Sequence, residues 1–356
     1  MTKTAAKKSS LTGSILPSER FWIDLQPFLL ERGYKLRPRY DPNWTPSWEK
    51  PWNFKDPASC PDGISRSIVL DAIRVSDGTK VALKKVNIHS EVPLLRVLSS
   101  PELLADFRNN TVPILDVIPL PNDDVFALIV MPVLYHFDSP FTPFRHASEV
   151  LEAIEQFAQG LAFLHEYHIA HRDMCYLNLM MDPTKVIPGG FHFARKSFQD
   201  DLKNRIVYHD RRSVAPVRYY FIDYETAQRF SLGEQCVGIM GQERNVPEMS
   251  DTVPYDPFKL DVYQLGAVIL RLIENYEGLE ILKPLAGAMT DTNPEKRLTA
   301  ADSVQKFQEL VSPLTEDDLS QKIWLRSLSP EDRLAVGFPV KNPFWYRYFE
   351  FLCCCC

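Results

Sequence analysis

Hydrophobic and polar residues alternate on both sides of a short polar turn in the first quarter of the chain. Residues 67–75 read SIVLDAIRV, residues 80–86 read KVALKKV, and SDGT lies between them. Alternation with a period of two around an Asp-Gly turn is typical of a β-hairpin. Two further short apolar runs, 112–120 and 124–134, predict strands. We therefore expect a β-rich section that ends near residue 132.

A spacing of three and four residues predicts helices in the rest of the chain. Within 147–168, one face would carry Val150, Ile154, Phe157, Leu161 and Leu164. This is the pattern of a buried amphipathic helix. The segment 260–276 is apolar nearly all round, as a central core helix would be. A shorter helix is expected over 90–100, with Ser90 as its N-cap.

These elements predict an α+β fold of two lobes, with a small β-rich lobe before a larger helical one. Residues 1–20 are polar, and we expect them to be disordered. Residues 21–59 are rich in Trp, Pro and Arg, which predicts one amphipathic helix and an extended segment packed on the next domain. We expect the β-rich lobe over 60–133, the helical lobe over 134–315 and a tail over 316–356.

Composition narrows the class of protein. The 356 residues are 45% hydrophobic and 24% charged, which is ordinary for a soluble globular protein with a sizeable core. The formal net charge is −6, whereas a nucleic-acid partner needs a basic face. We therefore expect no nucleic-acid binding.

No targeting or membrane segment is evident. The N-terminus lacks the apolar core of a secretory signal, and the longest apolar run, 125–134, is about half the roughly 20 residues of a membrane helix. The cysteines show no metal-ligand or disulfide spacing, which favours an intracellular, cytoplasmic protein, with the nucleus as an alternative. Membrane association is expected only if the terminal cysteines, Cys353 to Cys356, are acylated; the alternative is an unstructured tail.

The segment HIAHRDMCYLNLMM (168–181) carries the most distinctive polar residues. Asp173 is followed five positions later by Asn178, directly after a long predicted helix. The ordinary interpretation of such a pair is a capped turn. His-Arg-Asp-x-x-x-x-Asn, however, resembles the catalytic loop of eukaryotic protein kinases. The resemblance implies that Asp173 accepts the substrate hydroxyl's proton, that Asn178 binds Mg²⁺, and that Arg172 belongs to the catalytic set.

Other segments match the same family in the same order. KVALKKV is similar to the kinase strand whose alanine covers the adenine and whose lysine binds the phosphates of ATP, here Ala82 and Lys84. Val69 and Met131 would complete the nucleotide pocket. Glu91 shares a helix face with Leu95 and Leu98, and the resemblance implies that it pairs with Lys84. A first-turn acid stabilised by the helix dipole is the alternative for Glu91.

The segment YYFIDYETAQRF (219–230) places Asp223 where the kinase Asp-Phe-Gly motif has its magnesium-binding carboxylate. Glu225 replaces the glycine of that motif, which puts the flip between active and inactive states in doubt. The resemblance further implies a buried salt bridge between Glu248, in the segment VPE, and Arg297, in NPEKRLTA.

The chain departs from the family at three places. The glycine-rich phosphate loop is nearly absent, since its positions fall at Asp62, Ile64 and Ser67. Cys175 stands where serine/threonine kinases have a catalytic lysine. An insertion at about 185–216, mostly polar, separates Asn178 from Asp223 by 45 positions (223 − 178). A loop of that length is usually functional or mobile.

This insertion, the lead-in LRPRYDPNWTPSW and the segment VRYYFIDYE make the chain similar to a fungal, basidiomycete-type family of protein-kinase-like proteins. The resemblance implies a phosphotransferase that uses ATP and Mg²⁺ and acts on a protein hydroxyl. The degenerate phosphate loop, Cys175 and Glu225 favour the alternative, a pseudokinase that binds nucleotide or partners without turnover. A small-molecule kinase on the same fold is a third possibility.

Overall fold

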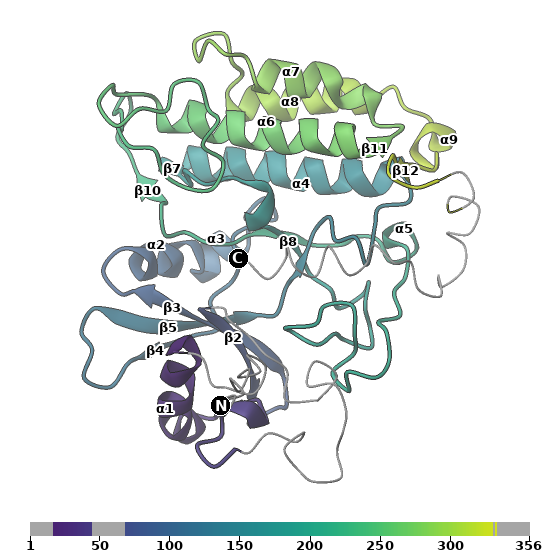
Figure 1. The fold of residues 1–356 in the computed structure, drawn as a ribbon. Helices are drawn as coiled ribbons and strands as arrows, with labels where there is room; N and C mark the ends of the chain where they lie inside the picture. The colour runs from purple at the N-terminus through teal and green to yellow at the C-terminus, as the bar shows by residue number, and fades with distance from the viewer. Residues whose placement is uncertain (1–16, 45–67, 330–331, 333–356) are drawn as a thin grey trace, which may run out of the picture. The chain divides into compact units, whose positions relative to one another are not determined.

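The computed structural model describes residues 17–44, 68–329 and 332 (Figure 1). The expected phosphate loop at 60–67 and the terminal cysteines lie outside these residues. The described chain falls into two compact units. The first holds 17–44, 68–85 and 189–207, and the second holds 86–188 and most of 208–332.

The first unit begins with the amphipathic helix predicted within 21–59, but this helix starts earlier than expected. Helix α1 begins at Pro17, inside the segment expected to be disordered, and Glu19 is already buried. Glu19 accepts two hydrogen bonds from Arg39, at 2.6 and 2.9 Å, and both side chains are shielded from solvent. A buried carboxylate needs such a partner, so the helix starts where Glu19 can reach Arg39. The elements of this unit are α1 (Pro17–Glu31), β1 (Tyr34–Leu36), η1 (Pro38–Tyr40), β2 (Val69–Arg74) and β3 (Lys80–Asn87).

The predicted hairpin around Asp77 and Gly78 is confirmed. Strands β2 and β3 pair antiparallel, with Val69 opposite Lys84 and Leu70 opposite Leu83. Gly78 has a φ of 73°, which the turn requires and which glycine adopts without cost. Strand β1 pairs antiparallel with β2, so β1, β2 and β3 form one antiparallel sheet in the first unit. In the second unit, β4 pairs antiparallel with β5, and a mostly helical region follows in the chain.

Part of the polar insertion packs within the first unit. Residues 189–207 belong to the first compact unit, where Phe191 and His192 are almost fully buried. Lys80 on β3 donates to the carbonyl of Phe191 at 2.8 Å and forms an ion pair with Asp200. These contacts hold the stretch 189–207 within the first unit, and the expectation that the insertion is functional or mobile stays a prediction.

Acidification should weaken this packing through His192. Its Nδ1 accepts the N–H of Arg195 at 3.1 Å. Burial, with the nearby charges of Arg37, Lys80 and Arg195, lowers the pKa of His192 to about 3 from its ordinary 6.5. Because the folded-state pKa is the lower one, the unfolded chain binds the proton more readily, and stability falls as pH drops below about 6.5.

Between pH 7 and pH 5 we expect a loss of about 2 kcal/mol from His192, measured by urea unfolding. His192→Asn keeps a hydrogen-bond acceptor near the position of Nδ1 but cannot titrate. Between pH 7 and pH 5 its free energy of unfolding should therefore fall by about 2 kcal/mol less than that of wild type. If wild type and variant lose the same stability, His192 is not the titrating group.

The second unit is built on long helices that lie side by side, and Figure 1 shows α4, α6, α7 and α8 in this arrangement. The predicted helices 147–168 and 260–276 are confirmed as α4 and α6, with their apolar faces buried. Its first elements are α2 (Glu91–Leu98), α3 (Pro101–Leu104), β4 (Asp116–Pro119), β5 (Phe126–Pro132), β6 (Tyr135–His136), α4 (Ala147–Glu166), β7 (Ile169–Ala170), η4 (Tyr176–Asn178) and β8 (Leu179–Met181). Its later elements are α5 (Arg211–Val214), β9 (Tyr219–Phe221), β10 (Gln228–Arg229), α6 (Pro257–Asn275), β11 (Tyr276–Glu277), η5 (Glu280–Leu282), α7 (Lys283–Met289), α8 (Ala300–Val311), α9 (Glu316–Leu319) and β12 (Trp324–Leu325).

Helix α2 differs from its prediction at the N-terminus. Ser90 precedes the helix but has helical backbone angles, and its side chain makes no capping hydrogen bond. The helix ends at Leu98 rather than at 100. The predicted buried face is confirmed, since Glu91, Leu95 and Leu98 are each less than 4% exposed.

The chain returns from the insertion along one face of α4. Glu149, Glu152 and Gln156 follow a spacing of three and four residues, which places them on one side of the helix. Their side-chain oxygens accept the backbone N–H groups of Arg212, Val217 and Tyr219, at 3.0 to 3.1 Å. These contacts guide the chain into β9, so the length of the insertion does not displace the residues after it.

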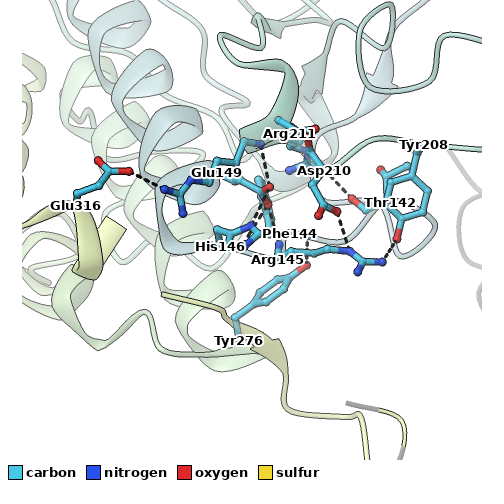
Figure 2. Close-up of polar contacts among 12 residues, drawn as sticks. Thr142, Phe144, Arg145, His146, Glu149, Tyr208, Asp210, Arg211, Tyr276 and Glu316 are labelled. Carbon is cyan, nitrogen blue, oxygen red and sulfur yellow. Dashed lines mark hydrogen bonds and ion pairs between the residues drawn. The ribbon is translucent and has the colours of Figure 1, made fainter. Parts of the chain in front are cut away.

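Among these three side chains, Glu149 accepts the most backbone hydrogen bonds, and Figure 2 shows its surroundings. Besides Arg212, it accepts the backbone N–H of Arg145 at 2.7 Å and of His146 at 3.3 Å. Arg211 is buried beside it and donates to the carbonyls of Phe137 and Thr142 (Figure 2).

In the described part of the chain no helix is both long and apolar enough to cross a membrane.

Candidate functional site

A strand pair brings Asn178 and Asp223 to the same place in the second unit. Leu179, which begins β8, pairs with Phe221, which ends β9. The carbonyl of Asn178 accepts the N–H of Ile222 at 3.0 Å. Asn178 precedes one strand and Asp223 follows the other, so antiparallel pairing places them at one end of the sheet β6-β8-β9.

Asp173 is joined directly to Asn178. The Asn178 Nδ2 donates to the Asp173 Oδ2 at 3.0 Å and to the Asp173 carbonyl at 2.9 Å. The backbone N–H of Gln242 donates to the Asp173 Oδ1 at 2.8 Å. Both side chains are buried, at 5% and 3% exposure. Because the amide nitrogen of Asn178 is used on Asp173, its side-chain oxygen is the atom suited to bind a cation.

Asp261 on α6 holds the loop before Asp173. This carboxylate is fully buried and accepts the backbone N–H groups of His171 and Arg172, at 2.8 and 2.7 Å. It also contacts the Nε2 of His165 at 3.0 Å. Gln264, one turn further along α6, accepts the N–H of Met174 at 2.8 Å. The backbone of the loop is therefore fixed by side chains of the central helix.

Two residues of the site have left-handed backbone angles. Arg172 has a φ of 64° and Asp223 a φ of 66°. Such angles cost energy for residues other than glycine and are found where function constrains the backbone. Glu225 is not among the residues with positive φ in the described chain. In the segment 223–225, the residue with the unfavourable backbone angle is thus Asp223. Because its φ is not positive, the position of Glu225 does not require a glycine.

Tyr224 anchors the segment that carries Asp223. Its ring lies 4.8 Å from the imidazole of His171, and its hydroxyl donates to the Thr111 Oγ1 at 2.9 Å. Its backbone N–H donates to the Glu91 Oε1 at 3.3 Å. Burial lowers the pKa of His171 and favours its neutral form. A neutral His171 can donate from Nε2 to the carbonyl of Ile222, at 3.1 Å.

Arg172 is buried, and its side chain extends toward the segment 228–240. Its guanidinium lies 5.7 Å from the ring of Phe230, and it donates to the Gln228 Oε1 at 3.3 Å. These contacts suit a residue that holds a neighbouring segment in place. The predicted place of Arg172 in a catalytic set stays a prediction.

The residues predicted to bind the nucleotide are divided between the units. Val69, Ala82 and Lys84 lie in the first unit, where Val69 and Lys84 are directly opposite and Lys84 is only 7% exposed. Met131 lies on β5 in the second unit and is buried. Glu91 also belongs to the second unit, so its pairing with Lys84 stays a prediction.

The donor chemistry fits magnesium held together with phosphates. The side-chain oxygens of Asn178 and Asp223 are hard ligands of the kind that Mg²⁺ prefers. Among the described residues, no group of three or more His, Cys, Asp and Glu side chains could hold a metal. Magnesium commonly has one or two carboxylate ligands and takes the rest from substrate phosphates and water.

Cys175 brings no charge to this site. It is buried two residues after Asp173, and burial raises the pKa of its thiol to about 12. The thiol is therefore neutral at physiological pH, whereas a lysine at this position would be cationic.

The sequence pattern did not identify the residues that fix the loop. Asp261 and Gln264 lie in DVYQLG (261–266), which resembles the Asp-x-x-x-x-Gly of the kinase central helix, but the resemblance did not indicate that they contact the loop. Gly241 and Gln242 belong to no motif that signals a site. A carboxylate inside an otherwise apolar helix was the available clue for Asp261, since a buried charge requires partners. No protein-family model matches this chain, and a search of curated proteins found no match.

Proposed function

We propose that this protein is a phosphotransferase of the protein-kinase type, which moves the γ-phosphoryl group of ATP to a protein hydroxyl. The observation that carries the proposal is the meeting of Asp173, Asn178 and Asp223 in the second unit. Asp173 is hydrogen-bonded to Asn178, and β8 pairs with β9 so that Asp223 follows at the same end. A carboxylate base and two oxygen ligands in one place are what phosphoryl transfer requires.

In this proposal each residue has one task. Asp173 accepts the proton of the attacking hydroxyl as general base. Asn178 and Asp223 would hold magnesium, which when bound neutralises negative charge on the phosphates. Lys84, with Glu91 to orient it, would bind the phosphates of ATP, and Val69, Ala82 and Met131 would line the adenine site. The burial of Lys84 opposite Val69 supports this assignment.

A nucleotide-binding module without turnover is the second candidate. The neutral Cys175 thiol favours it, because the cation that would stabilise the transferred phosphate next to the base is missing. The two candidates share the magnesium site and differ in whether the phosphoryl group is transferred.

Magnesium-ATP should stabilise the protein through Asp223. Ligand at about 100 times its dissociation constant adds about 2.7 kcal/mol, which raises the melting temperature by about 3–6 °C for a chain of this size. The shift should require magnesium. Asp223→Asn removes the carboxylate charge but tolerates the left-handed backbone, so it should lose most of the magnesium-dependent shift in differential scanning fluorimetry.

Asp182→Asn is the matched control, because Asp182 directly follows β8 at the opposite end of the same strand. Its shift should equal that of wild type. If wild type shows no shift at millimolar ATP and magnesium, the phosphotransferase proposal is wrong. A shift with ATP alone that survives Asp223→Asn would favour the module without turnover.

A further inference from the structure

The carboxylate of Asp173 is held from two sides. Asn178 donates to Oδ2 at 3.0 Å, and the backbone N–H of Gln242 donates to Oδ1 at 2.8 Å. A carboxylate can accept about four hydrogen bonds. These contacts therefore leave acceptor capacity on the carboxylate for a substrate hydroxyl.

Gly241 is what allows the backbone to come this close. Its φ is 77°, and a Cβ built on it would lie 2.5 Å from the Asp173 Oδ1 and 2.7 Å from its Cγ. Side-chain carbons do not approach other atoms to less than about 3 Å in real structures, so any other residue would push the two segments apart.

The segment around Gly241 is itself fixed. The Arg244 Nε donates to the carbonyl of Gly241 at 2.8 Å, and the Gln264 Nε2 donates to the carbonyl of Glu243 at 3.2 Å. Gln264 also accepts the N–H of Met174, next to Asp173. One side chain of α6 thus holds both the loop of Asp173 and the segment that contacts its carboxylate.

We propose that Gly241 and the backbone N–H of Gln242 are positioning elements for Asp173: the N–H holds the carboxylate, and Gly241 allows the backbone to approach it. The role rests on the proposed function, because it presupposes that Asp173 is a catalytic base. A fixed N–H keeps the carboxylate in one rotamer and costs no reorganisation during the reaction. Gly241 therefore matters for turnover and not for nucleotide binding.

Steady-state kinetics of Gly241→Ala test this role, with γ-labelled ATP and the best acceptor from a library of Ser-, Thr- and Tyr-containing peptides. We expect kcat to fall about 100-fold, the effect of displacing a reacting group by about 1 Å. The KM for ATP and the thermal shift with magnesium-ATP should stay as in wild type.

A control variant separates positioning from backbone strain. Gly233→Ala places a Cβ at a φ of 78° with no atom within 4 Å. It should retain kcat to within about twofold. Arg244→Ala, which removes only the hydrogen bond to the Gly241 carbonyl, should lower kcat about 3- to 10-fold and stay folded.

Wild-type kcat in both Gly241→Ala and Arg244→Ala would overturn the inference and leave the proposed function intact. A rise in kcat would also overturn it, since the segment would then be covering Asp173 rather than positioning it. An inactive wild type would overturn the proposed function and this role with it.

Discussion

Asp173→Asn should reduce phosphoryl transfer by about 10²- to 10⁴-fold, the usual contribution of a general base. The side chain keeps its size but can no longer accept the hydroxyl proton. Binding of magnesium-ATP should remain, because Asp173 would act on the hydroxyl rather than on the nucleotide, and an asparagine can still accept the hydrogen bond from Asn178. Transfer from labelled ATP measures the first effect, and the magnesium-ATP thermal shift measures the second.

The same substitution should also lower the melting temperature. An asparagine has one acceptor oxygen, whereas the N–H groups of Asn178 and Gln242 both point at this side chain. One buried donor is left unsatisfied, which costs about 1–3 kcal/mol. The ligand-induced shift must therefore be compared with the melting temperature of the unliganded variant. Full transfer activity in a folded Asp173→Asn protein would exclude Asp173 as the base.

Glu248→Ala should destabilise the fold by about 3 kcal/mol. The predicted salt bridge is confirmed: Arg297 pairs with both carboxylate oxygens of Glu248, and its side chain is fully buried. Removing one partner of a buried pair costs about 3–5 kcal/mol. We expect the lower end of this range, because Arg297 keeps hydrogen bonds to the carbonyls of Lys259 and Asp291.

Glu309→Ala is the control for this measurement. Glu309 pairs with Lys306 at 3.6 Å on the exposed side of α8, and such pairs contribute less than about 1 kcal/mol. Urea unfolding of both variants gives the comparison. Equal stabilities of Glu248→Ala and Glu309→Ala would mean that the buried pair makes no net contribution.

Several elements could be predicted from the sequence because their signals are local. The turn at Asp77 and Gly78 depends on four consecutive residues, and strands β2 and β3 follow from alternation on either side. Helices α4 and α6 follow from apolar spacing within one segment. The α+β class and the buried face of α2 required nothing beyond these patterns.

Other local features depend on residues that are distant in the sequence. The start of α1 depends on Arg39, which pairs with Glu19 from 20 positions away. The stretch 189–207 is held by Lys80, more than a hundred positions earlier. The composition of a segment describes that segment alone. It cannot show that one of the segment's apolar or charged side chains has a buried partner elsewhere in the folded chain.

For the candidate site, the sequence specifies which residue types are present: Asp173, Asn178 and Asp223, in an order that resembles a kinase. How they are held depends on the folded chain. The pairing of β8 with β9 brings Asn178 and Asp223 together across the insertion, and Asp261 fixes the loop of Asp173 from another helix. Gly241 reaches the carboxylate through its backbone. A sequence motif specifies side chains, whereas a backbone N–H is present at almost every residue. The role of the Gln242 N–H can therefore be seen only in the folded chain.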